Sequence, residues 1–252
     1  MNEKGLLKAK QIITESNDII VFTGAGISTE SGIPDFRSPG GLWEKFDPAI
    51  YANYFHFLQH PEDYWKMERE VTKMISDVEP NAAHYAIAEL AERDKLKAVI
   101  TQNVDMLHGK AKTKAPIYEL HGSAATASCQ DCRSQIGRKR LLLKMEDEEI
   151  LRCDECQGLI KPDVVLFGES LPMRTMNKAI AATQDADCFI VVGSSLLVSP
   201  ANTFPRLAKE HGAQIIIINM EPTMFDSIAD VCLCGKAGDI LPKLIPTPQN
   251  LE

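Results

Sequence analysis

The chain has 252 residues, of which 44% are hydrophobic and 25% are charged, as in an average globular protein. This length suits one large domain or two small ones. The formal net charge of -8 argues against a nucleic-acid partner, because phosphate contacts depend on clustered lysines and arginines. The one basic run, at 138–140, is typical of a solvated turn.

The sequence lacks the apolar segments that direct a chain to a membrane. Residues 1–16 hold no continuous apolar stretch of signal-peptide length, and Leu6, Ala9 and Ile13 recur at helical spacing. No stretch reaches the roughly 18 apolar residues of a membrane span. We therefore expect a cytoplasmic protein without a membrane partner.

Short runs rich in isoleucine and valine predict β-strands covered on both faces, because most do not alternate with polar residues. The predicted strands are 18–22, 97–101, 116–120, 163–167, 188–192 and 214–219. Helical patterns lie between many of them, at 81–94, 176–186 and 200–212, the last with Gly212 as its C-terminal cap. This alternation predicts an α/β fold with a Rossmann-like parallel sheet and helices on both faces.

Two segments interrupt the alternation and predict a smaller inserted domain. Residues 38–78 are crowded with aromatic side chains, which indicate the core of a helical module rather than a platform for stacking nucleic-acid bases. Residues 123–161 hold most of the cysteines. We therefore expect a large domain of residues 1–37, 79–122 and 162–252, and a small domain that combines the modules at 38–78 and 123–161.

Four of the seven cysteines form two CxxC pairs separated by residues 133–152, a spacing typical of a zinc ribbon. The predicted ligands are Cys129, Cys132, Cys153 and Cys156. Four thiolates leave no open position on Zn²⁺, so the metal would be structural. The alternative, two disulfides or unrelated thiols, is disfavoured in a reducing compartment. The remaining cysteines are expected to be buried core thiols: Cys188, Cys232 and Cys234.

The stretch "FTGAGISTESGIPDFR" at 22–37 is the most distinctive part of the chain. Gly24 and Gly26 follow a predicted strand directly, where a tight turn and bare backbone N–H groups can meet a pyrophosphate. The dinucleotide fingerprint is incomplete, since Thr29 stands where its third glycine would fall. The serine, aspartate and arginine behind the glycines suggest that a reaction occurs here as well as binding.

Further motifs follow in a fixed order: "TQNVD" at 101–105, "LHG" at 120–122, "LFGE" at 166–169, "GSSLLVSP" at 193–200 and "IINMEP" at 217–222. With the opening stretch and the four cysteines, they resemble the sirtuin family of NAD-dependent protein deacylases, from about Ile20 to Pro242. The resemblance implies NAD as co-substrate, structural Zn²⁺, and an acyl-lysine protein or peptide bound between the domains. Residues 109–114 depart from the family pattern.

The resemblance also implies which residues bind the substrates. The expected NAD contacts are Gly24, Ala25, Gly26, Glu30, Asp35, Phe36, Arg37, Gln102, Asn103, Asp105, Gly193, Ser194, Ser195, Asn219, Met220, Glu221 and Ala237. The expected peptide contacts are Val165 and Gly168, which would pair with the substrate backbone, and Phe167, which would wall the acyl-lysine tunnel.

Some of these residues have plainer alternatives. Asn103 and Asp105 could cap a helix opened by "NVDMLH" as well as bind ribose and nicotinamide. Arg37 could form a surface salt bridge with Asp35. Ala237 could be no more than a small residue in a turn.

His121, at the end of a predicted strand, is the expected general base. In the implied mechanism the acyl oxygen attacks the nicotinamide ribose and expels nicotinamide, and His121 then deprotonates a ribose hydroxyl. Asn103 is expected to place the ribose and a water, while His108 serves packing. One alternative comes from another class of function: a non-catalytic NAD-sensing or zinc-ribbon interaction module. A closer alternative is an enzyme that transfers ADP-ribose.

The acyl preference can be predicted from "PEDYWKMERE" at 61–70. Sirtuins that prefer succinyl or malonyl lysine resemble one another in a tyrosine followed three residues later by an arginine. Here the pair would be Tyr64 and Met67, or Trp65 and Glu68 in a shifted register, so neither register supplies the cation. We expect neutral acyl groups, acetyl first. The oligomeric state is open, with a monomer as our expectation.

Overall fold

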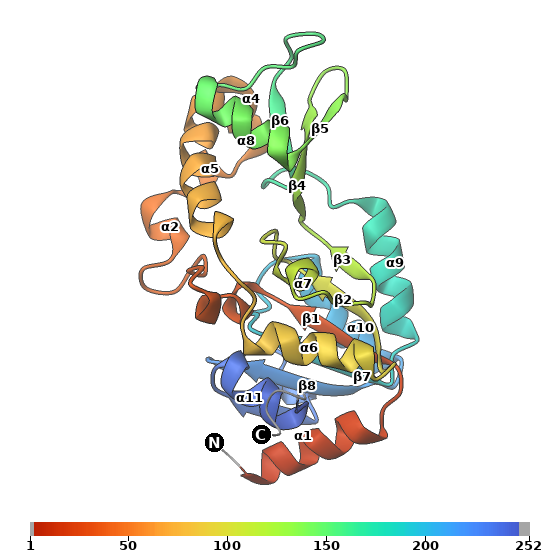
Figure 1. Ribbon diagram of the computed structural model, residues 1–252. Coiled ribbons are helices and arrows are strands. Elements are labelled where there is room, and N and C mark those ends of the chain that lie inside the picture. Colours follow the sequence, from red (N-terminus) through yellow and green to blue (C-terminus); the bar gives the residue numbers. More distant parts are fainter. Residues whose placement is uncertain (1–2, 247–252) are drawn as a thin grey trace.

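The computed structural model describes residues 3–246, which form a six-stranded and a three-stranded sheet with the helices around them (Figure 1). The large sheet has the order β3-β2-β1-β7-β8-β9, and all its neighbouring strands are parallel. Its strands are β1 (Ile19–Thr23), β2 (Leu96–Thr101), β3 (Ile117–Glu119), β7 (Cys188–Val192), β8 (Gln214–Asn219) and β9 (Val231–Cys234). The order reverses between β1 and β7, and ligands of open α/β sheets bind at such a point.

Helices cover the two faces of this sheet. Ile19 and Val21 of β1 join a core with α1 (Glu3–Glu15), α6 (Ala82–Glu92) and α11 (Ala237–Leu244). Ile20 and Phe22 point the other way, into a core with α9 (Met173–Gln184) and α10 (Phe204–Glu210). Every residue of β1 and β7 is buried, which explains their uninterrupted apolar sequences.

The upper part of Figure 1 holds the smaller sheet, β5-β4-β6, and a group of helices. Its strands are antiparallel: β4 (Gly122–Cys129), β5 (Gln135–Gly137) and β6 (Ile160–Val164). The helices are α2 (Leu42–Lys45), α3 (Pro48–Tyr51), α4 (Tyr54–Gln59), α5 (Pro61–Ser76) and α8 (Arg138–Asp147). Phe57 and Trp65 share a third core with Ala127 and Leu151, so the helical segment and the cysteine-rich segment pack as one unit.

Short elements complete the chain. Helix α7 (Leu107–Lys110) follows β2, and single 3₁₀ turns lie at Ala25–Ile27, Thr29–Ser31, Ala201–Thr203 and Asp226–Ile228. None of the helices within residues 3–246 combines the length and apolarity needed to cross a bilayer.

The predicted fold class is confirmed: a parallel sheet with helices on both faces, joined to a smaller part that carries the four cysteines. The expected helices at 81–94, 176–186 and 200–212 correspond to α6, α9 and α10. Gly212 has φ +94° just beyond α10, as a glycine cap requires.

The expected parallel strand at 163–167 is wrong. The strand there is β6, at 160–164, and it pairs antiparallel with β4 in the small sheet. A short apolar run shows that a strand is buried but not which strand it pairs with. The expected domain boundary at residue 162 therefore falls inside β6.

Two smaller expectations are also wrong. The basic run at 138–140 opens helix α8 instead of forming a turn, and Arg138 is half-buried. Cys188 is buried as expected, but Cys232 and Cys234 are exposed. They lie on the edge strand β9, whose residues alternate between buried and exposed.

Candidate active site and zinc centre

A cavity of about 970 Å³ lies at the carboxyl edge of the large sheet and extends to α5 and the segment after β6. Most of the predicted NAD and peptide residues line it, as does the expected base: Gly24, Ala25, Gly26, Asp35, Phe36, Arg37, Gln102, Asn103, His121, Val165, Phe167, Gly168, Gly193, Ser194, Ser195, Asn219, Met220, Glu221 and Ala237. Glu30 and Asp105 do not line this cavity.

The glycines after β1 serve close backbone packing. The N–H groups of Gly24 and Gly26 donate to the carbonyl oxygens of Val192 and Gly193, at 3.1 and 2.9 Å. A Cβ atom on Gly24 would lie 2.7 Å from the Gly193 oxygen, and one on Gly193, where φ is +59°, would lie 2.3 Å from the Ile27 nitrogen. The expectation that both glycine amides are bare is therefore wrong.

Ala25 is the remaining residue of the turn that could offer an amide to a phosphate. It begins a 3₁₀ turn, and the first N–H of a helix has no acceptor within that helix. Ala25 also lines the cavity. Ala25 is therefore the candidate donor of this turn.

Glu30 lies outside the cavity because its carboxylate is used elsewhere. Its Oε2 accepts the N–H of Gly238 at 2.7 Å, in the first turn of α11. A carboxylate at a helix N-terminus stabilises the helix dipole. Glu30 therefore acts on the cavity indirectly, by holding the start of α11, where Ala237 lines the wall.

Asn103 and Asp105 lie beside a second pocket of about 60 Å³, which shares Ala25, Phe36 and Asn103 with the large one. Asp105 accepts the hydroxyl of Ser28 at 2.7 Å and the N–H of Leu107, the first residue of α7, at 2.9 Å, although Met106 holds the N-cap position. Burial raises the pKa of Asp105, and these hydrogen bonds offset part of that effect.

Ser28 is a site residue that the sequence analysis missed. It is 1% exposed, and its hydroxyl also accepts the side-chain N–H of Asn103 at 3.3 Å. The amide of Asn103 donates in addition to the Gly24 carbonyl at 3.1 Å. The serine of "GAGIS" thus fixes both polar side chains, and its place in the glycine-rich turn was the signal that could have revealed it.

The predicted base is held in one tautomer. His121 Nδ1 lies 3.0 Å from the carbonyl oxygen of Gln102, which can only accept, so Nδ1 carries the proton and Nε2 is the basic nitrogen. Burial lowers the pKa of His121, and the bond to Gln102 opposes that shift. The side chain of Gln102 donates to Ser194 Oγ at 2.9 Å, which connects the ends of β2 and β7.

His108 lies behind this segment, outside the cavity, as a buried residue. Its Nε2 contacts the hydroxyl of Thr23 at 2.9 Å, and its ring lies 5.0 Å from that of His84. Burial lowers the pKa of His84 to about 4 and that of His108 to about 3. Both imidazoles are therefore neutral in the folded protein at pH 7.

The segment after the glycine turn lines the cavity with two aromatic side chains, Phe36 and Trp43. Phe36 lies 4.9 Å from Trp43, ring centre to ring centre, and Trp43 lies 6.5 Å from Phe167. Asp35 accepts the backbone N–H of Arg37 at 2.9 Å, which fixes the turn. Within residues 3–246 the Arg37 side chain forms no ion pair with Asp35, and Arg37 faces the cavity.

The predicted peptide residues lie where β6 leaves the small sheet. Phe167 is bridged to α3 and α4, since its N–H donates to Ala52 and its carbonyl accepts from Tyr54, at 2.9 and 3.0 Å. Val165 donates its N–H to the His121 carbonyl at 2.8 Å. Any pairing of Val165 with a peptide must therefore use its carbonyl oxygen.

Helix α5 supplies one wall of the cavity. Tyr64, Met67 and Glu68 line it, whereas Trp65, Lys66 and Arg69 do not. Arg69 points toward α8 and donates to the carbonyl oxygens of Glu148 and, at 2.9 Å, Glu149. Neither Lys66 nor Arg69 of this helix offers its charge to the cavity.

The four predicted cysteines converge as a metal site requires. Their sulfur atoms all lie within 4.8 Å of one another, with Cys129 to Cys156 at 3.5 Å and Cys132 to Cys153 at 3.7 Å. Tetrahedral Zn–S bonds of about 2.3 Å place sulfurs about 3.8 Å apart, so the set fits Zn²⁺. These sulfur separations exceed the disulfide bond length of about 2.05 Å, which sets aside the disulfide alternative.

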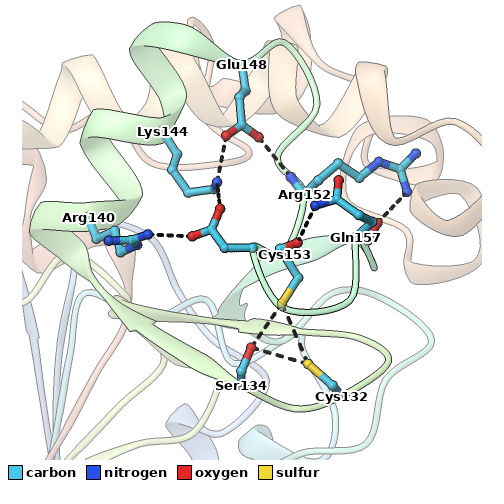
Figure 2. Close-up of polar contacts among 9 residues, drawn as sticks. Cys132, Ser134, Arg140, Lys144, Glu148, Arg152, Cys153 and Gln157 are labelled. Carbon is cyan, nitrogen blue, oxygen red and sulfur yellow. Dashed lines mark hydrogen bonds and ion pairs between the residues drawn. The ribbon is translucent and has the colours of Figure 1, made fainter.

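Figure 2 shows how the cysteine loop is tied to α8. Lys144 bridges Glu148 at 2.6 Å and Asp154 at 2.8 Å, and Asp154 also pairs with Arg140 at 2.5 Å. Glu148 accepts the backbone N–H of Arg152 at 3.0 Å. Since Asp154 follows Cys153 directly, these ion pairs help to orient the second CxxC turn.

Known proteins resemble this chain over nearly its whole length. The profile of the Sir2 family matches residues 24–200. "NAD-dependent protein deacylase 2" of Archaeoglobus fulgidus is 46% identical over 99% of this chain and 98% of its own length.

Solved structures agree with the sequence matches. A Sir2 complex with p53 peptide and NAD⁺ superposes with a TM-score of 0.87 at 34% identity, over 97% of both chains. A Sir2 variant with deacetylated p53 peptide and 3′-O-acetyl-ADP-ribose gives 0.90 at 34% identity, over 95% of this chain and 96% of the other. The chain belongs to the Sir2 family.

Proposed function

We propose that this chain is an NAD-dependent protein-lysine deacetylase, which transfers the acyl group of acyl-lysine to ADP-ribose and releases nicotinamide and O-acetyl-ADP-ribose. One observation carries the proposal. His121, with its basic Nε2, faces the same cavity as Asn103, between the carboxyl edge of the large sheet and the wall on α5. The names of the relatives and the complexes of the solved neighbours support the same reaction.

NAD supplies the ribose carbon that the acyl oxygen attacks and the nicotinamide that leaves. The proposed role of the residues after β1 and β7 is to hold its phosphates, with the amide of Ala25 as donor. Phe36 would cover the ribose against water. Asn103 would orient the ribose, and the carboxyl of Asp105, in the smaller pocket, would hold the carboxamide of nicotinamide.

His121 would act after nicotinamide has left. Its Nε2 takes a proton from a ribose hydroxyl, so that the 2′ oxygen can bond to the acyl carbon, and water then releases the lysine amine. The Gln102 carbonyl holds the Nδ1 proton during the transfer and so keeps Nε2 free. The peptide would lie between Val165 and Gly168, with the acyl-lysine beside Phe167.

Two domains are proposed to form the cleft, because the large sheet and the small part have separate apolar cores. The cysteine cluster would hold structural Zn²⁺ in the smaller domain, away from the chemistry. We also propose a cytoplasmic, monomeric enzyme.

The test is direct. Purified protein is incubated with NAD and a panel of acyl-lysine peptides, and both products are identified by mass spectrometry. Free lysine peptide together with O-acyl-ADP-ribose supports the proposal. Peptide modified by ADP-ribose instead, or no NAD-dependent product, contradicts it.

A further inference from the structure

The wall of the cavity on α5 carries a carboxyl group that the proposed reaction does not use. Glu68 lines the cavity, although the residue is only 6% exposed. Its neighbours along the same wall are apolar: Met67, Val71 and Ile75. An acidic group in such surroundings is costly unless it has partners.

Glu68 has partners, but they leave part of its hydrogen-bonding capacity free. Tyr64 donates its hydroxyl to Oε2 at 3.1 Å, and Thr72 donates to Oε1 at 3.3 Å. A carboxylate offers about four acceptor positions. Two donors therefore leave acceptor positions free on a residue that lines the cavity.

Two cations lie near Glu68, but their hydrogen bonds go to other groups. Lys161 pairs with Glu169 at 3.1 Å and donates to the carbonyls of Pro162 and Val164 at 3.0 and 2.6 Å. Arg138 donates through Nη1 to the Ala124 carbonyl at 2.9 Å, while its Nη2 is buried without a hydrogen-bond partner among the described residues. Within residues 3–246 no lysine or arginine forms an ion pair with Glu68.

The protonation of Glu68 reflects this setting. Burial raises its pKa, while the bonds from Tyr64 and Thr72 and the more distant charges of Arg138 and Lys161 act in the opposite direction. In either protonation state an oxygen of Glu68 can accept a hydrogen bond from a group in the cavity.

We infer that Glu68 is a specificity-determining residue, which selects neutral acyl chains that carry a hydroxyl group at the depth of Tyr64 and Glu68. This inference rests on the proposed deacylation. A hydroxyl placed there donates to Glu68, whereas a methyl group leaves the remaining acceptor positions unused and a carboxylate brings a second acidic group against Glu68. Sites that hydrogen-bond a substrate hydroxyl discriminate strongly against analogues that lack it.

The experiment uses one peptide with a graded set of acyl groups. Butyryl, hexanoyl and octanoyl lysine are compared with ω-hydroxyacyl partners in which the terminal methyl is replaced by hydroxyl, and acetyl lysine is included. We measure kcat/KM for the wild type, Glu68→Gln, Glu68→Met and the control Glu70→Gln. Glu70 lies on the same helix but pairs with Lys45 at the surface.

For acyl chains of one length, the wild-type kcat/KM should be about tenfold or more higher for the ω-hydroxyacyl peptide than for the alkanoyl peptide, as expected for a hydrogen bond to a charged or strongly polar group. Glu68→Met should reverse the preference, because the hydroxyl then has no partner. Glu68→Gln, which keeps the size and an acceptor oxygen, should reduce the preference several-fold. Glu70→Gln should behave as the wild type.

The outcomes separate the two proposals. Removal of acetyl and alkanoyl groups without a hydroxyl preference at any length overturns the inference about Glu68 and leaves the proposed function standing. An equal preference in wild type and Glu68→Gln also overturns it. Failure to remove any acyl group with NAD contradicts the proposed function itself. Thermal melting of each variant shows whether a loss reflects unfolding.

Discussion

Replacement of His121 by alanine should abolish most deacylation while the fold is preserved. The imidazole lies in the cavity with Nδ1 bonded to the Gln102 carbonyl, so the substitution removes the basic Nε2 and one hydrogen bond. Loss of a general base typically costs ~10²–10⁴-fold in rate. At 1.36 kcal/mol for each factor of ten, that is about 2.7–5.4 kcal/mol of transition-state stabilisation.

The pH dependence of kcat/KM tests the same prediction independently. Burial lowers the pKa of His121 below its ordinary value of about 6.5, so the neutral base predominates throughout the neutral range. The wild-type kcat/KM should therefore be flat from pH 8 to 7 and decline only at more acidic pH. His121→Ala should lack that decline.

The assay is steady-state kcat/KM on an acetylated peptide, with nicotinamide exchange measured in parallel. Exchange should survive in His121→Ala, because nicotinamide leaves before His121 acts. His211→Ala is the matched control, since the exposed His211 also bonds a backbone carbonyl, that of Leu207, through Nδ1 at 2.9 Å. Near wild-type turnover in His121→Ala, or an equal loss in both variants, would refute the reasoning.

Three further predictions concern the metal, acid stability and acyl charge. Cys153→Ala should lose zinc and much of the stability of the smaller part, because metal binding and folding are coupled; full metal content with an unchanged melting temperature would contradict the site. His84 and His108 have pKa values of about 4 and about 3 in the fold, against about 6.5 unfolded, so the unfolded chain binds more protons and stability is lost as the pH falls below 6.5. Between pH 7 and pH 5 these two groups should lower the free energy of unfolding by about 4 kcal/mol. His84→Gln should lose less of this free energy than the wild type when urea unfolding is measured at both pH values; equal losses would argue against the prediction. Acetyl peptide should exceed succinyl in kcat/KM by about 100-fold or more, because Glu68 faces the cavity and Arg69 turns away from it; equal rates would reveal a cation that reaches the pocket.

The sequence predicted the central strands well because their burial leaves a strong signal. Residues 188–192 and 214–219 were placed to the residue, since such strands read as unbroken apolar runs. Strand β9 was missed because it lies at an edge and alternates, and β4 because it is built from small residues. The partner of β6 depends on contacts distant in sequence, which a local run does not encode.

The candidate site was predicted from the sequence in the same way, and contacts between distant segments were again missed. Motifs at strand ends predicted which residues would line the cavity, and the family resemblance supplied their roles. The engagement of the Gly24 and Gly26 amides by the β7 loop could not be predicted, since it joins segments about 170 residues apart. The inward position of Glu68 was also uncertain, because the sequence allowed two alignments of α5 with the tyrosine–arginine pair of the family.

The packing of the β1 and β7 loops has a consequence for cofactor affinity. Their backbones interlock at Gly24, Gly26 and Gly193, where any side chain would meet backbone atoms at less than 3.0 Å. Fixing a residue's backbone costs about 1–2 kcal/mol, and here that ordering is complete before NAD arrives. The phosphate side of the cleft is therefore pre-organised, so a cofactor loses little binding energy to conformational entropy there.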